Sequence, residues 1–476
     1  MIGTSTVEWM LIRVSILAFR YAPILYSIPI ILLIGVHGAR AWTFFTTGTF
    51  TALLLAEAFF YVLAWKPAQR RLRLQAQHPA SQTRDERRGL FQRCITTAPD
   101  PAAYIQGWFL GADLDDVRRD NVREFLLWAF FDHDGTVCAD GDEDELEDYV
   151  TGIEQALGRK LEPGRSSVKS LRLTFDEIET AYRGLLWYAV IFMVDQATHA
   201  LMMWYGYQYH AAESARQAFP PRPQNLWAPK RSPVRRLSYW YHPHQGNKAQ
   251  QPVVFFHGIG IGLLTYIGFL NGIRRRSNTG IIAIELLPIS FRLTDPPPNR
   301  IEFVQQMVTI LDHHRWDRVA LVSHSYGSVL TTHALGSPLL QSRVTSVVLT
   351  DPVTIMLHLP HVAYNFTRRR PRQANEWQLW YFASTDPGVA HCLGRHFFWR
   401  ENIIWAEDLL HNDRKVAVSL AGRDIIVNTA AVGEYLEQEK NIQVVSFPGL
   451  DHAQVFDDRR GLRTLVDLVH ATTAAY

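Results

Sequence analysis

One serine of this chain lies in a pattern that suits nucleophilic catalysis. Residues 323–327 read Ser-His-Ser-Tyr-Gly, after an apolar run and before a helix predicted over 328–335. A serine on a sharp turn between a strand and a helix exposes its hydroxyl, and the turn needs small residues two positions before and after it. Gly327 meets this need, whereas Ser323 replaces the usual glycine. The pattern predicts Ser325 as a nucleophile, although ordinary polar turns also produce it.

Two further residues occupy similar places later in the chain. Asp424 follows an apolar run at 415–421, and His452 follows another at 442–447. A neutral imidazole can take the proton of a serine hydroxyl, and a carboxylate holds the imidazole in the required tautomer. Upstream, the glycine-rich stretch 257–262 also follows an apolar run. Backbone N–H groups of such a loop can point at a developing oxyanion.

Together these motifs resemble the α/β-hydrolase family, in particular its serine lipases and esterases. The resemblance covers residues from about 238 to the C-terminus, and the chain order serine, aspartate, histidine agrees with it. It implies an α/β-hydrolase fold with a helical cap, and needs neither a cofactor nor a metal. It further implies Ser325 as nucleophile, His452 as general base and Asp424 as the orienting acid. The oxyanion hole would be the backbone N–H groups of Ile259 and Tyr326.

Neighbouring residues leave alternatives open. Asp351 also follows a strand-like run, and some members of the family place the acid there. Asp424 is preferred because the loop after the penultimate strand is the commoner place. Asp451 is expected to cap its loop, and His324 is expected to be structural. A His-x4-Asp pattern that begins at His452 also occurs in acyltransferases, so transfer to an alcohol stays a second hypothesis.

The N-terminal region predicts a membrane anchor. Residues 21–37 are apolar and uncharged, and residues 42–65 carry Glu57 as their only charge. Two such runs predict a transmembrane hairpin, with a pair of buried core helices as the alternative. Glu57 is costly in lipid and is expected to face a partner helix or a headgroup. A further apolar run at 184–205 is expected to be a buried or interfacial helix.

Basic residues predict the orientation of this hairpin. The connecting turn holds Arg40 alone, whereas basic residues gather outside both runs: Arg13, Arg20, Lys66, Arg70, Arg71 and Arg73. Lysine and arginine favour the cytoplasmic side, so both ends and the catalytic part are expected to face the cytosol. The predicted location is the endoplasmic reticulum or a lipid droplet.

Composition agrees with such a location. The net charge of +2 suggests no nucleic-acid partner. The cysteines Cys94, Cys138 and Cys392 are odd in number and far apart, which argues against a disulfide framework and against zinc-ligand spacing. A reducing, cytosol-facing environment follows.

Three regions are predicted along the chain. Residues 1–66 form the membrane anchor, 67–232 a mainly helical region, and 233–476 the catalytic domain. The helical region ends in a segment rich in proline and arginine, 211–236, which is expected to be an extended linker. The cap is expected at about 353–412, and its many aromatic residues suit an apolar acyl chain or a membrane surface.

The predicted function is a membrane-associated serine hydrolase that cleaves lipophilic carboxylic esters through an acyl-enzyme. Its partners would be a lipophilic ester and membrane lipid. The alternatives are an acyltransferase that uses the same serine, and a catalytically inactive membrane scaffold. The sequence does not distinguish oligomeric states or name the ester.

Overall fold

The computed structural model describes residues 2–135, 141–245 and 250–474 of the 476-residue chain. The chain forms two compact units, each assembled from three separate segments. Unit 1 consists of Met1–Leu74, Ile178–Asp317 and Arg370–Cys392, and unit 2 of Gln75–Glu177, Arg318–Arg369 and Leu393–Tyr476. Each unit combines segments from more than one predicted region, and the boundaries after residues 66 and 232 stay predictions.

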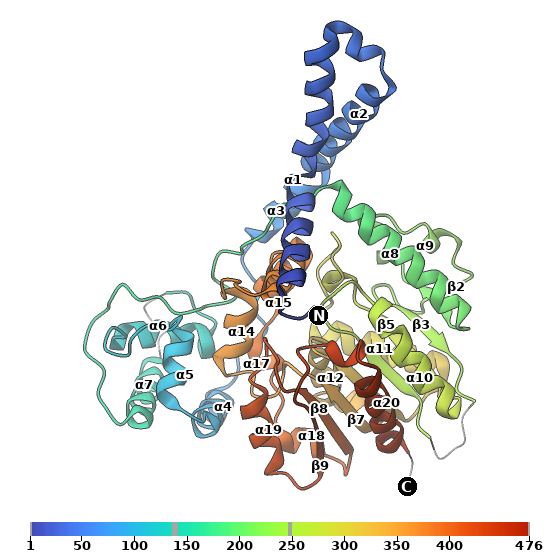
Figure 1. Ribbon diagram of the computed structural model, residues 1–476. Helices are drawn as coiled ribbons and strands as arrows, with labels where there is room; N and C mark the ends of the chain where they lie inside the picture. Colours follow the sequence, from blue (N-terminus) through green and yellow to red (C-terminus); the bar gives the residue numbers. More distant parts are fainter. Residues whose placement is uncertain (1, 136–140, 246–249, 475–476) are drawn as a thin grey trace. The chain divides into compact units, whose positions relative to one another are not determined.

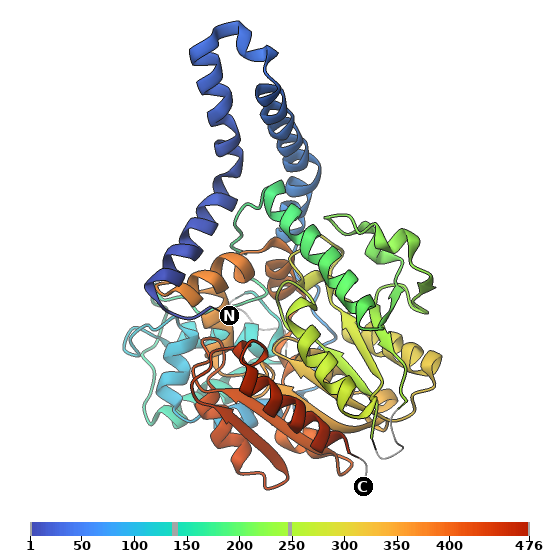
Figure 2. The ribbon, with the colours of Figure 1, turned by 45° about the vertical axis from the view of Figure 1, so that its right-hand side comes forward.

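Two long apolar helices begin unit 1. α1 (Thr6–His37) starts at a capping box, in which the side chains of Ser5 and Glu8 each accept a hydrogen bond from the other's backbone N–H. A 3₁₀ turn leads to α2 (Phe45–Phe60), which continues through a π-helical turn into α3 (Lys66–Leu72). Figures 1 and 2 both show α1 and α2 side by side, projecting from the rest of unit 1. Among the described residues, three helical stretches are long and apolar enough to cross a membrane: Thr6–Thr43, Phe45–Leu72 and Leu185–Trp204.

The first half of α1 packs against aromatic residues of the predicted cap. Ile12 and Ile16 of α1 form a buried cluster with Tyr381, and the partly buried Trp377, Trp380 and Phe382 pack against it. The guanidinium of Arg13 lies over the ring of Trp377, 3.9 Å from its centre. In this part of the predicted cap, the aromatic residues therefore pack against α1. Their density had instead predicted that they would bind an acyl chain or a membrane surface.

Glu57 ties α2 to α8 (Leu185–Trp204). Its side chain is buried and accepts hydrogen bonds from the Tyr182 hydroxyl and from the backbone N–H of Leu185, at 3.0 and 3.2 Å to its two oxygens. A carboxylate at the start of a helix is favoured because the first N–H groups have no partner within the helix. Gly184 leaves the space, since an added Cβ there would lie 2.6 Å from a Glu57 oxygen. The prediction that Glu57 faces a partner helix is confirmed.

Unit 1 also contains five strands in the order β2-β1-β3-β5-β4. β4 and β5 are parallel, and β3 runs antiparallel to both of its neighbours. Every residue of β4 and β5 is buried, which agrees with their uninterrupted apolar sequences. The strands are β1 (Gln208–Ala211), β2 (Lys230–Arg231), β3 (Ser238–His242), β4 (Val253–Phe256) and β5 (Ile281–Glu285), and two helices, α10 (Ile267–Ser277) and α11 (Arg300–His314), follow β4 and β5.

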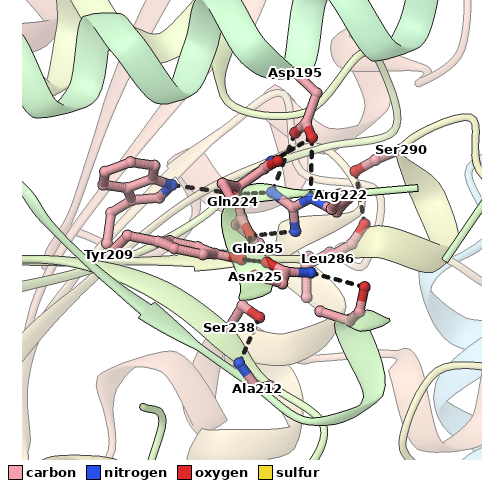
Figure 3. A network of polar contacts seen from close by, with 12 residues as sticks. Asp195, Tyr209, Ala212, Arg222, Gln224, Asn225, Ser238, Glu285, Leu286 and Ser290 are labelled. Atoms are coloured by element: carbon pink, nitrogen blue, oxygen red, sulfur yellow. Dashed lines mark hydrogen bonds and ion pairs between the residues drawn. The ribbon is translucent and has the colours of Figure 1, made fainter. Parts of the chain in front are cut away.

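The segment rich in proline and arginine is not an extended linker, and that prediction is wrong. It contains β2, a 3₁₀ turn at Ser214–Gln217 and α9 (Gln224–Trp227), and its Arg222 is buried. Figure 3 shows Arg222 between two carboxylates: it contacts Asp195 of α8 at 3.0 and 3.1 Å and Glu285 of β5 at 2.8 and 2.9 Å. Two bidentate pairs offset the cost of burying the guanidinium. Nothing in the sequence indicated these contacts, because the partner carboxylates lie 27 and 63 residues from Arg222.

Unit 2 is built on four parallel strands in the order β6-β7-β8-β9. Almost every residue of β6, β7 and β8 is buried, as expected for parallel strands covered on both faces. Parallel strands need crossover connections, and helices supply them here. The strands are β6 (Val319–His324), β7 (Val344–Thr350), β8 (Lys415–Ala421) and β9 (Ile442–Phe447), and the helices are α12 (Gly327–Leu335), α13 (Pro338–Gln341), α19 (Thr429–Glu437) and α20 (Arg459–Thr473).

Four further helices of unit 2 come from the predicted helical region, and they are α4 (Arg84–Thr97), α5 (Pro101–Trp108), α6 (Arg119–Phe131) and α7 (Glu143–Leu157). α4 begins at a capping box of Thr83 and Glu86. Phe91 of α4 stacks on Tyr149 of α7, with ring centres 4.3 Å apart. Cys94 and Cys392 are both buried, and Cys138 lies outside the described residues.

The predicted cap segment is helical, and its residues belong to both units. α15 (Ala374–Gln378), a π-helical stretch at Leu379–Ser384 and the first part of α16 (Pro387–His396) belong to unit 1. α14 (Pro360–Thr367), α17 (Trp399–Asn402) and α18 (Ala406–Leu410) belong to unit 2.

We expect Asp195→Ala to lower the stability of the chain by about 3 kcal/mol, because it removes the carboxylate that Arg222 and Arg292 both contact in the interior. The measurement is the thermal unfolding midpoint of the purified chain in detergent, which should fall by several degrees. Asp115→Ala is the matched control, because its ion pair with Arg159 lies at the surface, with the Asp115 side chain 81% exposed. That change should cost about 0.5 kcal/mol or less. Equal shifts in the two variants would contradict the expectation.

Candidate active site

Ser325 lies at the turn between β6 and α12, and its backbone has φ = +52°. Few residues other than glycine adopt this left-handed conformation, and a strained nucleophile at a strand-to-helix turn is typical of hydrolytic serines. The N–H of Ser325 donates to the carbonyl of Thr350 at 3.0 Å, which fixes the turn against the end of β7. Ser323 fits where glycine is usual, because its buried hydroxyl accepts a hydrogen bond from Thr331 at 3.0 Å.

His452 connects the serine to a carboxylate. Its Nε2 lies 2.8 Å from the Ser325 hydroxyl, and its Nδ1 lies 2.7 Å from Oδ2 of Asp424. All three side chains belong to unit 2, and Ser325 and His452 are almost completely buried. Because Nδ1–H donates to the carboxylate, Nε2 presents its lone pair to the serine hydroxyl. The structure therefore brings together the three residues that the sequence predicted as a triad.

The loop after β8 fixes the orientation of Asp424. Its Oδ1 accepts hydrogen bonds from the N–H groups of Ile426 and Val427 at 2.7 and 2.9 Å, which leaves Oδ2 for the histidine. Gly422 lets this loop approach the loop that carries His452, since an added Cβ would lie 2.6 Å from the backbone of Pro448. Both ends of the histidine–carboxylate pair are thus held by backbone contacts.

Asp351, the rival acid, has a different use. Its two oxygens accept N–H groups from Ala421 and Ala453 at 2.8 and 2.9 Å, so it ties the ends of β7 and β8 to the residue after His452. The geometry favours Asp424 over Asp351 as the partner of His452. Sequence reasoning weighed Asp351 only as a catalytic acid and missed this positioning contact, for which no sequence signal exists.

Two more acidic residues near His452 have loop roles. Asp451 accepts hydrogen bonds from the N–H groups of Ile425 and His452 at 3.0 and 2.7 Å, as expected of a loop cap. Asp457 lies just before α20, and the next residue, Asp458, caps that helix. The His-x4-Asp spacing is therefore also explained by the start of a helix.

The charges around His452 change its pKa. Burial by itself would lower the pKa of the imidazole, but the charge and hydrogen bond of Asp424, with smaller contributions from Asp351 and Asp451, outweigh burial and raise it to about 9. Burial, together with the nearby Asp424 charge, raises the pKa of Asp351 to about 6. His324 lies below this group, with its ring centre 5.2 Å from that of His452 and Nε2 3.8 Å from Asp351.

The two residues predicted to form the oxyanion hole belong to different units. Tyr326 follows Ser325 directly in unit 2, and it is the N-cap residue just before α12. Ile259 belongs to unit 1. Its loop is fixed by the buried ring of His257, which donates from Nδ1 to the Gly258 carbonyl at 2.8 Å and accepts from the Leu286 N–H at 2.9 Å. The roles of Ile259 and Tyr326 stay predictions.

Comparison with known proteins identifies the fold. Residues 251–401 match the sequence model of the alpha/beta hydrolase fold family, a stretch that includes Ser325 and ends before Asp424 and His452. The matched part of the chain has the alpha/beta hydrolase fold. This confirms the predicted fold class for the catalytic part. No curated protein matches the chain in sequence.

Several solved structures are similar to part of the chain. One is a carboxylesterase of Nitrososphaera gargenis, with 16% identity, a TM-score of 0.37, and coverage of 51% of this chain and 97% of that one. A carboxylesterase of Bacillus subtilis has 12% identity, a TM-score of 0.36, and coverage of 60% and 98%. A membrane phospholipase A described as a bacterial virulence factor has 12% identity, a TM-score of 0.39, and coverage of 60% and 94%. With such low TM-scores, none of these structures bears on substrate or reaction.

We expect Asp424→Asn to reduce kcat for a short soluble ester by about 10⁴-fold, because the amide stabilises the wrong tautomer of His452 and no imidazolium. Asp351→Asn should cost far less, since Asp351 contacts backbone N–H groups and not the imidazole nitrogens. Both substitutions preserve side-chain volume, so each variant controls for the other. Steady-state kinetics on the two purified variants measures the difference. The reverse ranking would transfer the acid role to Asp351.

The raised pKa of His452 predicts a pH dependence. A general base acts in its neutral form, so kcat/KM should be low where His452 is protonated and should rise as pH increases toward about 9. Removal of the Asp424 charge in Asp424→Asn should move the midpoint of the residual activity to lower pH. Initial rates on a soluble ester at closely spaced pH values measure both midpoints. A rate that is constant from neutral pH to about pH 9 would contradict the expectation.

Proposed function

We propose that this α/β-hydrolase is a membrane-associated serine hydrolase of lipophilic carboxylic esters. The observation that carries the proposal is the chain of two short hydrogen bonds, 2.8 Å from Ser325 to His452 and 2.7 Å from His452 to Asp424. A serine hydroxyl next to a neutral imidazole that is oriented by a carboxylate is the arrangement that activates an oxygen nucleophile.

In the proposed reaction, Oγ of Ser325 attacks the ester carbonyl carbon while Nε2 of His452 takes the hydroxyl proton. Donors next to the carbonyl oxygen, proposed as the N–H groups of Tyr326 and Ile259, stabilise the tetrahedral oxyanion. The intermediate expels the alkoxide, which takes the proton from His452 and leaves as the alcohol. Water then repeats the two steps on the acyl-enzyme, releases the carboxylic acid and restores Ser325.

The lipophilic part of the proposal is supported by aromatic residues next to the nucleophile. Phe397 of the cap segment is buried in unit 2, and its ring centre lies 6.1 Å from that of Tyr326. Large aromatic rings bury an apolar acyl group effectively. The segment that contains Trp377 and Trp380 contributes less to this argument, because those rings contact α1.

The membrane part of the proposal is supported by apolar side chains that α1 and α2 leave exposed. Val36, Phe45 and Leu63 are 76%, 89% and 71% exposed, although water would disfavour each of them. The only carboxylate of α2, on Glu57, is already hydrogen-bonded inside the protein, which lowers the cost of placing this helix in lipid. The basic residues outside both runs support the proposal that the catalytic part faces the cytosol.

The decisive experiment uses the full chain in detergent. A fluorophosphonate probe should label the wild type and fail to label Ser325→Ala, and hydrolysis of a short ester should fall by at least about three orders of magnitude in kcat. Ser342→Ala, an exposed serine of the same unit, is the control and should behave as wild type. Wild-type protein that neither reacts with the probe nor cleaves esters would support the inactive scaffold. Esters formed with an added alcohol in place of free acid would support the acyltransferase.

A second experiment tests the proposed membrane association. Alkaline extraction of cell membranes should leave wild type and Ser325→Ala in the pellet, since the anchor does not depend on catalysis. Lysine at two of the exposed positions, in the pair Phe45→Lys and Leu63→Lys, should release protein into the soluble fraction. Release of the wild type itself would contradict membrane insertion while leaving the serine hydrolase proposal intact.

A further inference from the structure

Three histidine side chains gather in unit 1, which does not contain the serine. His210 lies in β1, and His313 and His314 end α11. One ring nitrogen of each histidine lies within 4.8 Å of one from each of the others. The histidines come from segments about 100 residues apart, so neither a short motif nor a helical repeat explains their meeting.

A tyrosine hydroxyl orients two of these rings. The Tyr239 oxygen lies 3.1 Å from Nδ1 of His210 and 2.9 Å from Nε2 of His314. A phenolic oxygen has two lone pairs and can accept N–H from both rings, which places a lone pair on the opposite nitrogen of each. In metal-binding histidines, the N–H of the second ring nitrogen commonly donates a hydrogen bond to an acceptor in the protein. That bond fixes the orientation and the tautomer of the ring.

Aromatic stacking holds the same rings in place. His210 stacks on Tyr239 at 4.6 Å between ring centres, and His314 stacks on Tyr241 at 3.9 Å. Both tyrosines belong to β3, which pairs with β1. The imidazoles of His210 and His314 are therefore held in place by β3. His313 is exposed and can adjust its rotamer.

One nitrogen of the cluster lacks a partner. Nε2 of His210 is buried and makes no hydrogen bond within the part of the chain that the structure describes, and the residue is 3% exposed. A buried polar atom without a partner costs about 1–3 kcal/mol, so such an atom calls for a ligand. It is the ring nitrogen opposite the one that faces Tyr239.

We propose that His210, His313 and His314 bind a divalent transition-metal ion, most favourably zinc. Three imidazoles without a thiolate suit zinc with a water as fourth ligand. Zinc–nitrogen bonds of about 2.0–2.1 Å place tetrahedral ligands about 3.4 Å apart, so nitrogens at the 4.8 Å limit of this cluster must close in by about 1.4 Å. The exposed His313 can supply its own part of that movement. The bound ion would join β1 to the end of α11 and thereby stabilise this edge of unit 1.

One charge opposes the ion. Lys230 lies beside His210 in the pairing of β1 with β2, and its ammonium contacts Gln208. A nearby positive charge weakens cation binding, and Lys230→Gln should therefore tighten it. This expected gain separates a metal site from a purely aromatic cluster, which has no reason to bind more zinc when a lysine is removed.

The experiment titrates zinc into the full chain, purified in detergent without a histidine tag and treated with a chelator. Isothermal titration calorimetry should show a single zinc ion per chain. His313→Ala and His314→Gln should each weaken binding by at least about 100-fold, since each removes one ligand. His411→Ala, an exposed histidine of unit 2, is the matched control and should bind as wild type. Cobalt substitution should give the visible absorption of a tetrahedral site, and His313→Ala should abolish it.

Two results would overturn the proposal. One is a wild-type chain that takes up no zinc. The other is zinc uptake that is equal in wild type, His313→Ala and His314→Gln, which would place the ion elsewhere. Circular dichroism of each variant confirms that it is folded, so a loss of binding is not a loss of structure.

Discussion

The site depends on the parallel direction of β6, β7, β8 and β9. Parallel neighbours end at the same edge of a sheet, so the loops that follow them meet there. Those four loops carry Ser325, Asp351, Asp424 and His452. Ser325 and His452 are 127 residues apart in sequence and 2.8 Å apart in space. The strands bring these groups together, and the loops determine which atoms face one another.

Backbone hydrogen bonds give the buried carboxylates of Asp424 and Asp351 different roles. Asp424 gives one oxygen to two loop N–H groups and the other to His452. Asp351 gives both oxygens to backbone N–H groups, one of them on the residue after His452. The second carboxylate thereby positions the histidine without binding its ring. Its negative charge still adds to the rise in the His452 pKa.

Charges buried in pairs also hold the apolar helices in place. Glu57 of α2 accepts the first N–H of α8, and Asp195 of α8 contacts Arg222 and Arg292. Arg222, from the segment predicted to be a linker, therefore connects a long apolar helix to Glu285 of β5. Because each charge has a partner, these polar residues can lie inside a region whose composition predicts only apolar packing.

The sequence by itself predicted much of this protein. The motif around Ser325, the apolar runs before Asp424 and His452, and their chain order predicted the fold and the three residues that meet. The two N-terminal apolar runs predicted the long helices, and the single charge of the second run predicted a contact for Glu57. These features are local: each depends on spacing within a short segment, or on hydropathy along one element.

Only the tertiary structure decided which aspartate faces His452, how Arg222 is paired, what the cap tryptophans touch, and that three histidines meet beside Tyr239. Each of these depends on a contact between segments far apart in sequence. Such a contact is set by strand order, loop length and side-chain rotamers together, and none of these leaves a mark on either segment alone. The residue type is the same whether a carboxylate, a guanidinium or an imidazole faces water or a buried partner. Only the fold determines which of the two it faces.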